Sequence, residues 1–210
     1  MKNAKLVVAP TAELLTIEEC RSHLEAQVYN DSEQDALDDA MILALLGAAR
    51  EYCEAFLGLT LAPCTWEIAY DTFPAGAIEL PRGPVRSLVS ITVGDVTNSS
   101  SSDDYMLAPE SYVLDTHSLV PRVVPVTTWP TVTSATNTIR IQYRAGYGEE
   151  SSDLTEEGQP LPYAVRAAML LMLGHVYANR EAVVSGPAVT TLPLGVEALL
   201  RPLRVRLGMA

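Results

Sequence analysis

The sequence predicts an α+β protein that is mainly helical, with a proline-rich β region inserted into a discontinuous helical domain. Both ends of the chain show the helical spacing of apolar residues, whereas the middle alternates short β-branched and aromatic runs with turn signals. We therefore assign residues 1–62 and 160–210 to the helical domain and residues 63–159 to the β region. With 210 residues, of which 48% are hydrophobic, the chain can bury a sizeable core.

Two helices are predicted in the N-terminal part of the helical domain, after a short extended arm. Thr16 and Glu19 have the spacing of a capping box, in which each side chain satisfies the other's backbone N–H, so a first helix should cover residues 17–28. A second helix over residues 33–57 follows from apolar residues three or four positions apart, and Gly58 is placed to end it. These apolar residues are Leu37, Met41, Leu45, Ala48, Tyr52 and Phe56.

The β region is predicted to contain four short strands. Most of the 14 prolines of the chain lie inside or beside it, which is typical of edge strands, bends and extended connections. Segments 98–104 and 149–158 are polar, and we interpret them as a hairpin tip and an acidic loop. The predicted strands are residues 65–70, 88–93, 111–114 and 138–143.

Helical spacing returns at Pro162, which is a favourable residue for a first helical turn. The helix predicted over residues 163–180 is apolar on nearly every face, so it must be buried on more than one side. Either the helix over residues 33–57 or another subunit could cover it. The residues that we assign to a subunit contact are Met169, Met172, Val176 and Tyr177.

A linker over residues 185–195 leads to a last short helix over residues 196–207. Its three arginines have no acidic neighbour after Glu197, which makes a basic patch suited to an acidic partner. We expect segment 192–207 to dock on such a partner; the alternative is a terminal helix folded onto its own domain with solvated arginines. The docking residues would be Leu199, Leu200, Arg201, Leu203, Arg204 and Arg206.

Charge and hydropathy exclude two classes of partner. The net charge of −12 and the isoelectric point near 4.6 are the opposite of what a protein that grips nucleic acid needs. Neither a membrane-spanning run nor a full signal peptide is visible, so we expect a soluble protein that is made in the cytoplasm.

The cysteines do not indicate a disulfide framework or a metal site. Cys20, Cys53 and Cys64 are odd in number and form no CxxC pair, which favours small buried hydrophobic residues. Cys20 and His23 could reach one metal from a single helical turn, but without a second pair ordinary helix packing is the better interpretation. We expect no metal and no cofactor.

The motifs that would carry catalysis are incomplete. No serine lies in a G-x-S-x-G elbow, and residues 145–148 lack the lysine and the length of a phosphate loop, so a turn is favoured there. The acidic residues from Asp31 to Asp39 resemble a calcium loop, but Ala36 and Ile42 stand where glycine and glutamate are required. An acidic first helical turn explains them better.

The remaining titratable residues offer no recognisable catalytic group. Paired carboxylates at residues 103–104 and 149–150 lie in polar loops that would not separate their pKa values. His175 is central in the apolar helix and His117 lies in a strand connection. A catalytic triad needs spatial partners that the sequence does not show, so a core or interface histidine is favoured for His175. We expect no enzymatic activity and no catalytic residue.

An ordered series of short motifs resembles the head–tail connector (adaptor) proteins of tailed bacteriophages and gene transfer agents. The resemblance covers residues 14–206, and the order and spacing of the motifs carry it rather than any one of them. The motifs are Leu15-Thr16 with Glu19 and His23-Leu24, Ala48-Ala49-Arg50-Glu51-Tyr52, Thr65-Trp66, Phe73-Pro74, Ile78-Glu79-Leu80-Pro81, Gly83-Pro84-Val85, Tyr143 to Gly148, Gly174 to Glu181, Leu192-Pro193 and Gly195 to Leu200.

The resemblance implies a structural role in the neck of a virion that is assembled in the bacterial cytoplasm. Such adaptors form a ring, commonly of twelve copies, between the portal and the stopper or tail-completion protein, and their C-terminal segment docks on the portal. DNA passes through the ring without specific binding, and an acidic chain suits a conduit in which DNA slides. The long 98–104 tip and the acidic 149–158 loop depart from the family, so contacts of those loops are not carried over.

Two other functions stay open at this stage. The chain could be a virion-associated hydrolase that uses His175 or carboxylates, or a monomeric module whose β region binds a ligand. A pocket with convergent polar groups would favour the hydrolase, and an aromatic-lined groove the binding module.

Overall fold

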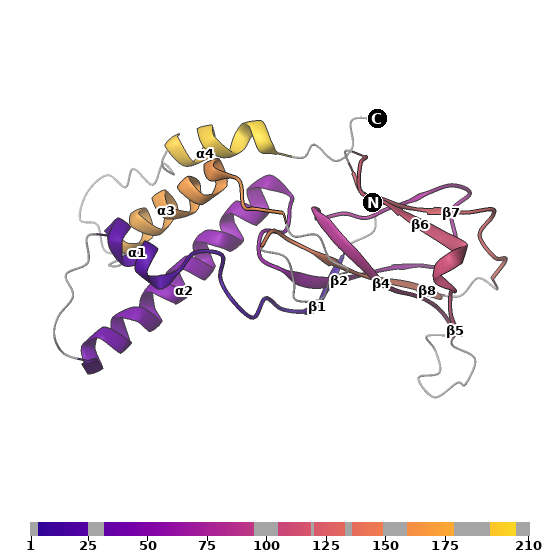
Figure 1. The fold of residues 1–210 in the computed structure, drawn as a ribbon, viewed down its shortest axis with the longest axis horizontal. Coiled ribbons are helices and arrows are strands. Elements are labelled where there is room, and N and C mark those ends of the chain that lie inside the picture. Colours follow the sequence, from indigo (N-terminus) through magenta and orange to yellow (C-terminus); the bar gives the residue numbers. More distant parts are fainter. Residues whose placement is uncertain are drawn as a thin grey trace. The chain divides into compact units, whose positions relative to one another are not determined.

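The chain forms two compact units in the computed structural model (Figure 1). Unit 1 comprises residues 1–11 and 62–159, and unit 2 comprises residues 12–61 and 160–210. The protein is α+β, but the expectation that it is mainly helical is wrong, because slightly more than half of the chain belongs to the unit of strands. The structure describes residues 4–24, 32–94, 105–118, 120–132, 136–148, 159–178 and 194–204, without the side chains of residues 32–38 and 194.

Unit 1 contains two antiparallel sheets. The larger has the order β1 (Lys5–Val8), β2 (Cys64–Tyr70), β8 (Ile139–Ala145), β4 (Val85–Val93), β5 (Tyr105–Met106). The smaller has the order β3 (Ile78–Glu79), β7 (Arg122–Pro125), β6 (Tyr112–Asp115).

The core of unit 1 lies on one face of the larger sheet. Alternate residues of the central strand β8, from Ile139 to Ala145, are buried, as the two-residue period of a strand requires. The Tyr143 hydroxyl donates to the Pro81 carbonyl at 2.6 Å, and burial raises the pKa of this phenol. Ile68 and Ile91 from the neighbouring strands β2 and β4, and Val123 from the smaller sheet, join the same core.

The four predicted strands are confirmed as β2, β4, β6 and β8, whereas β1, β3, β5 and β7 were missed. Each missed strand has two to four residues, so alternation within it is a weak signal. β1 also corrects the predicted domain boundary, because the N-terminal arm hydrogen-bonds to β2 and belongs with the strands. Residues 98–104 and 149–158 lie outside the described residues.

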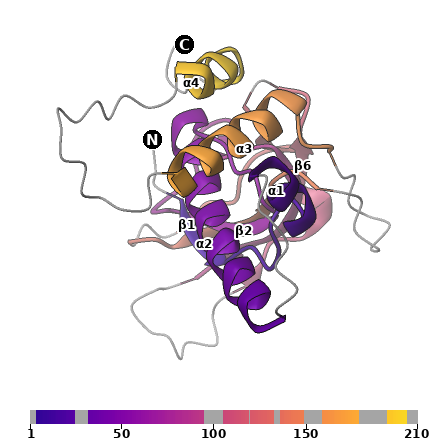
Figure 2. The same cartoon turned by 90° about the vertical axis from the view of Figure 1, so that its left-hand side faces the viewer.

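Unit 2 contains the α-helices of the described chain (Figure 2). The predicted capping box begins α1: Glu19 N–H donates to Thr16 Oγ1 at 3.2 Å, and Thr16 N–H donates to Glu19 Oε2 at 3.1 Å. Gly58 ends α2 as predicted, with φ of 72° and its N–H donating to the Glu54 carbonyl. The helices are α1 (Ile17–Leu24), α2 (Ser32–Leu57), α3 (Tyr163–Ala178) and α4 (Leu194–Leu200), followed by a 3₁₀ turn at Arg201–Leu203.

None of the helices, over the residues described, is long and apolar enough to cross a membrane.

Candidate interaction surfaces

Helix α3 is the central helix of unit 2, and this explains why it is apolar on all sides. It packs against α1, α2 and α4 of its own chain, as both views of the unit show (Figures 1 and 2). Val165, Ala168, Met169 and Leu173 are buried. The apolar surface that we expected another subunit to cover is therefore largely covered by α1, α2 and α4 of the same chain.

The four residues predicted to contact another subunit divide into two groups. Met169 has no exposed surface, so it is a core residue and its assignment to a subunit contact is corrected. Met172, Val176 and Tyr177 are half-buried on α3. These three retain some surface for a neighbour.

The C-terminal segment is only partly free to dock. Helix α4 packs on α3, and Val196 and Leu200 are fully buried, so Leu200 is a core residue rather than a docking anchor. The predicted alternative, a terminal helix folded onto its own domain, is thus correct for α4. Leu199 is half-buried.

The residues after α4 do present a surface. Arg201, Leu203 and Arg204 are exposed, and the Arg204 guanidinium lies over the Phe56 ring at 5.4 Å from its centroid. Arg206 lies outside the described residues. Two arginines on either side of an exposed leucine are the part of the predicted docking segment that remains available.

The buried face of helix α2 is displaced by one residue from the predicted series. Of that series, Met41, Leu45, Tyr52 and Phe56 are half-buried and Ala48 is exposed, while the side chain of Leu37 lies outside the described part. The exposed side of the helix carries mainly alanines, so it offers a partner little apolar area. The face that is buried instead consists of Ile42, Leu46, Ala49, Cys53 and Leu57.

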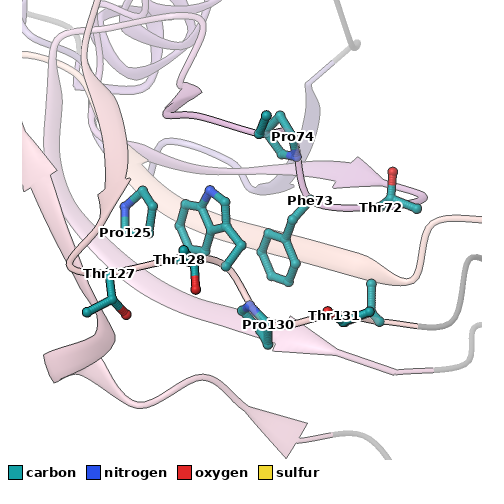
Figure 3. A pocket seen from close by; sticks show the side chains of 11 residues that line it. Thr72, Phe73, Pro74, Pro125, Thr127, Thr128, Pro130 and Thr131 are labelled. Carbon is teal, nitrogen blue, oxygen red and sulfur yellow. The ribbon is translucent and has the colours of Figure 1, made fainter.

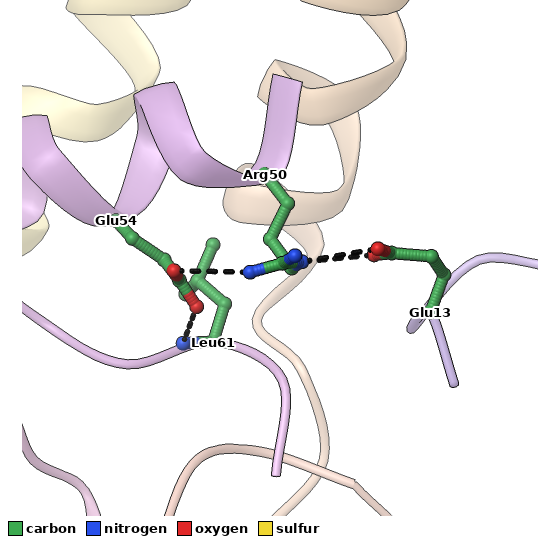
Figure 4. Close-up of polar contacts among 4 residues, drawn as sticks. All are labelled: Glu13, Arg50, Glu54 and Leu61. Carbon is green, nitrogen blue, oxygen red and sulfur yellow. Dashed lines mark hydrogen bonds and ion pairs between the residues drawn. The ribbon is translucent and has the colours of Figure 1, made fainter. Parts of the chain in front are cut away.

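A polar network at the C-terminal half of α2 is built around Arg50 (Figure 4). The Arg50 guanidinium donates from Nε to both Glu13 oxygens and from Nη1 to Glu54 Oε2 at 3.1 Å. The other Glu54 oxygen accepts the Leu61 backbone N–H at 2.8 Å. The pKa of Arg50 is raised: burial lowers it, but the carboxylates of Glu54 and Glu13 more than compensate. Through these contacts Glu13, which precedes α1, and Leu61, which follows α2, are both bound to side chains of α2.

Unit 1 carries an open groove of about 410 Å³ (Figure 3). The Phe73 and Trp129 rings stack in it with centroids 4.8 Å apart, and the Trp129 indole N–H donates to the Gly76 carbonyl at 2.7 Å. Prolines and threonines from segments 72–75 and 125–132 complete the lining. From the sequence, Phe73-Pro74 is only a motif of the resemblance, and the partner Trp129 is too distant in sequence to be paired with it.

The candidate catalytic histidines belong to different units. His117 is exposed in unit 1, and His175 is half-buried on α3 of unit 2. The N–H groups of Gly146 and Gly148 donate to the carbonyls of Pro84 and Gln159, so neither is free to bind an anion. Ala145 ends β8 and residues 146–148 continue it as irregular chain, not as the turn that the sequence favours. The carboxylate pairs at 103–104 and 149–150 lie outside the described residues.

The cysteines are free and buried, as predicted. Burial is the main cause that raises the pKa of Cys20 to about 11 and of Cys53 to about 12, so neither is a nucleophilic thiolate near neutral pH. Cys20 is fully buried while His23 of the same turn is exposed. Within the described residues no group of three or more His, Cys, Asp or Glu side chains could hold a metal ion.

No protein-family model and no curated protein matches the sequence. Solved structures do match over nearly the whole chain. A chain of the neck of an empty gene transfer agent (GTA) particle, computed with C6 symmetry, superposes with a TM-score of 0.76 at 21% identity, covering 99% of this chain and 98% of that chain. A chain of the native GTA virion gives 0.72 at 22% identity, with the same coverage.

A third chain, from the neck of the native GTA particle computed with C12 symmetry, gives a TM-score of 0.66 at 20% identity and covers 98% of this chain and 99% of that chain. At these identities the likeness establishes a shared fold from one end of the chain to the other.

Proposed function

We propose that the protein is a structural neck protein of a phage-like particle: a head–tail adaptor that forms a ring through which DNA passes. The observation that carries this proposal is the fold match over almost the full length of chains from GTA necks and virions. A match that includes both units is more informative than a shared single motif, because many unrelated functions reuse one motif. The proposed location is the neck of the virion.

The finer parts of the proposal follow from the ring. One fold relative comes from a neck computed with C12 symmetry, which supports twelve copies. The helices of residues 12–61 and 160–210 form the connector domain in this proposal, and the proline-containing strand unit is its insertion. The net charge of −12 suits a lumen that does not bind DNA. We propose no catalytic role.

The portal is the proposed partner of the exposed residues that follow α4. Arg201, Leu203 and Arg204 combine an apolar anchor with two positive charges on an acidic chain, which suits an acidic portal surface. A stopper or tail-completion protein would occupy the other end of the ring.

The test is assembly with portal-bearing heads purified from the same particle. We expect the chain to bind such heads as a ring, and the Arg201→Glu variant to fold normally but to bind them far less. Ser22→Glu is the control, because it introduces the same carboxylate at another exposed position of unit 2. If the protein is a single copy away from the DNA axis in assembled particles, the adaptor proposal is wrong.

A monomeric ligand-binding module is the second candidate, and the Phe73–Trp129 groove is the observation that favours it. A chain that stays monomeric both alone and with portal-bearing heads would support this alternative. A ring in either setting would support the adaptor.

A further inference from the structure

Strand β1 exposes apolar side chains on both of its faces. Leu6, Val7 and Val8 are between 43% and 51% exposed, although consecutive residues of a strand point to opposite faces of the sheet. In the described part of the chain β1 pairs with β2 alone, so its outer edge carries no strand. An apolar strand at an exposed sheet edge is a ready site for association with another chain.

Strand β5 forms the opposite edge of the same five-stranded sheet, and it is also apolar and exposed. Tyr105 is 47% exposed and Met106 is 65% exposed. Within the described residues β5 pairs with β4 alone. One sheet therefore ends in two different apolar edges, which we call the β1 edge (residues 5–8) and the β5 edge (residues 105–106).

The described residues on and beside the two edges differ in charge. Lys5 lies on β1, and residues 4–12 contain no Asp or Glu. Segment 87–121, which includes β5, contains no Lys or Arg. The carboxylates among its described residues are Glu110, which follows β5, and Asp115, which pairs with Arg122.

This charge pattern favours a second copy of the same chain as the occupant of each edge. Two β1 edges, or two β5 edges, would bring like charges together, whereas a β1 edge and a β5 edge attract each other. Elsewhere two copies, each with a net charge of −12, repel each other within a Debye length of about 8–10 Å. The β1 edge is thus a place where an acidic copy can approach its neighbour favourably.

A ring needs this kind of contact. In a cyclic assembly each copy meets its two neighbours through two different surfaces, unlike a twofold dimer, which uses one surface twice. Two of the matching chains come from GTA neck structures that were computed with C6 and C12 symmetry. Two unlike, complementary edges of one sheet satisfy this requirement within a single unit.

We propose that the β1 edge of each copy contacts the β5 edge of the next copy in the ring. The inference rests on the proposed adaptor function and adds the surfaces that build the ring. The twist that accumulates over five strands, roughly 80–100°, turns the two edges across each other, so side chains rather than a continued hydrogen-bond ladder should make the contact. Removal of the apolar side chains from water drives it, and the charges select the pairing.

A charge placed on the β1 edge is the first test. Val7→Glu should keep the circular dichroism of the unaltered chain and abolish the ring, both alone and on portal-bearing heads. Val126→Glu is the matched control, since it adds the same charge at a 58% exposed valine of the same unit, and it should assemble normally. If Val7→Glu forms rings as readily as Val126→Glu, the β1 edge is not a subunit contact.

Cross-linking covers the case in which Val7→Glu does not fold. The native cysteines are buried, so Val7→Cys and Met106→Cys introduce the accessible thiols. Within one copy the two edges are four strand spacings apart, about 19 Å, so a short bis-maleimide cannot join them there. It should join neighbouring copies of the double variant into a ladder of covalent multimers on a denaturing gel.

The single variants decide which edges meet. Neither Val7→Cys nor Met106→Cys alone should form covalent multimers, because each contact then holds only one thiol. Covalent dimers of Val7→Cys alone would show that two β1 edges meet, and they would overturn the proposal.

Two further outcomes separate this inference from the adaptor function. If the unaltered chain forms no ring in solution or on heads, the adaptor proposal fails and the edge contact fails with it. If the double variant forms rings that show no covalent ladder, other surfaces build the ring, so the inference fails while the adaptor stands.

Discussion

The chain passes from unit 2 to unit 1 between Leu61 and Ala62, and different interactions fix the backbone on the two sides. The last residue of unit 2, Leu61, donates its N–H to the Glu54 carboxylate, which Arg50 also binds. Unit 1 resumes at Ala62, and its carbonyl lies against Gly146, where an added Cβ would stand 2.6 Å from the Ala62 oxygen. One arrangement is electrostatic and the other is steric.

The difference determines how each arrangement responds to change. A steric contact between backbone atoms depends on hard-sphere repulsion, so it fails abruptly on substitution and ignores salt. The stabilisation from a charge network changes gradually. Conservative substitutions retain part of it, and solvent screens it more strongly the more exposed the charges are. The first two predictions below test this contrast, and the third concerns an exposed carboxylate of unit 1.

The largest effect is expected from Gly146→Ala. Gly146 has φ of 122°, which disfavours an L side chain, and the contact with Ala62 and Pro63 involves backbone atoms that cannot rotate away. We expect a loss of roughly 2–4 kcal/mol in the free energy of unfolding of unit 1. Trp66 and Trp129 both lie in unit 1, so tryptophan fluorescence during urea unfolding reports it.

Gly76→Ala is the matched control, because nothing lies within 4 Å of its added Cβ. Its effect should stay within about 1 kcal/mol of zero. Equal losses for the two alanine variants would show that the Gly146 contact is not steric.

A smaller effect is expected from Arg50→Met. It leaves the Glu13 and Glu54 carboxylates, with side chains 19% and 13% exposed, without their cation. We expect unit 2 to lose roughly 2 kcal/mol, measured by far-UV circular dichroism, which reports mainly the helices. Arg50→Lys should recover part of it, since it restores the charge without the forked geometry.

Arg21→Met is the control for this network. Arg21 pairs with Asp39 at 2.7 Å, but their side chains are 26% and 32% exposed, so its removal should cost about 1 kcal/mol or less. A loss as large as that of Arg50→Met would contradict the role given to burial.

Local signals in the sequence predicted local features of the fold. The capping box at Thr16, the helix end at Gly58 and the four predicted strands follow from side-chain chemistry within a few residues, and the structure confirms each. The short strands β1 and β5 lie at sheet edges, and pairing with another strand defines them rather than their own residues.

Two of the predicted site residues, Met169 and Leu200, are core residues, because their role depends on tertiary neighbours. Met169 and Leu200 are apolar residues on helices, and sequence alone does not distinguish a core position from a docking anchor. The apolar edges β1 and β5 were missed because only the order of strands in the sheet shows that they lie at its two ends. Phe73 and Trp129 are 56 residues apart, so only the fold reveals their stacking.

The smallest effect is expected from Asp115 at the end of β6, and it depends on pH. Hydrogen bonds from the Ser118 hydroxyl and the Arg122 guanidinium, followed by the N–H groups of His117 and Ser118, lower the pKa of this carboxyl from 3.8 to about 2. A pKa that is lower in the folded state stabilises the fold above the unfolded value, and this contribution is lost as the pH falls from about 4 to about 2. Asp115→Asn should therefore flatten the dependence of the urea midpoint of unit 1 on pH within this window, and Ser118→Ala, which removes the largest cause, should flatten it in part. Other carboxyls also titrate in this pH window. Their contribution is removed by comparing each variant with the unaltered chain at every pH. A pH dependence in Asp115→Asn as steep as in the unaltered chain would show that this carboxylate does not stabilise the turn.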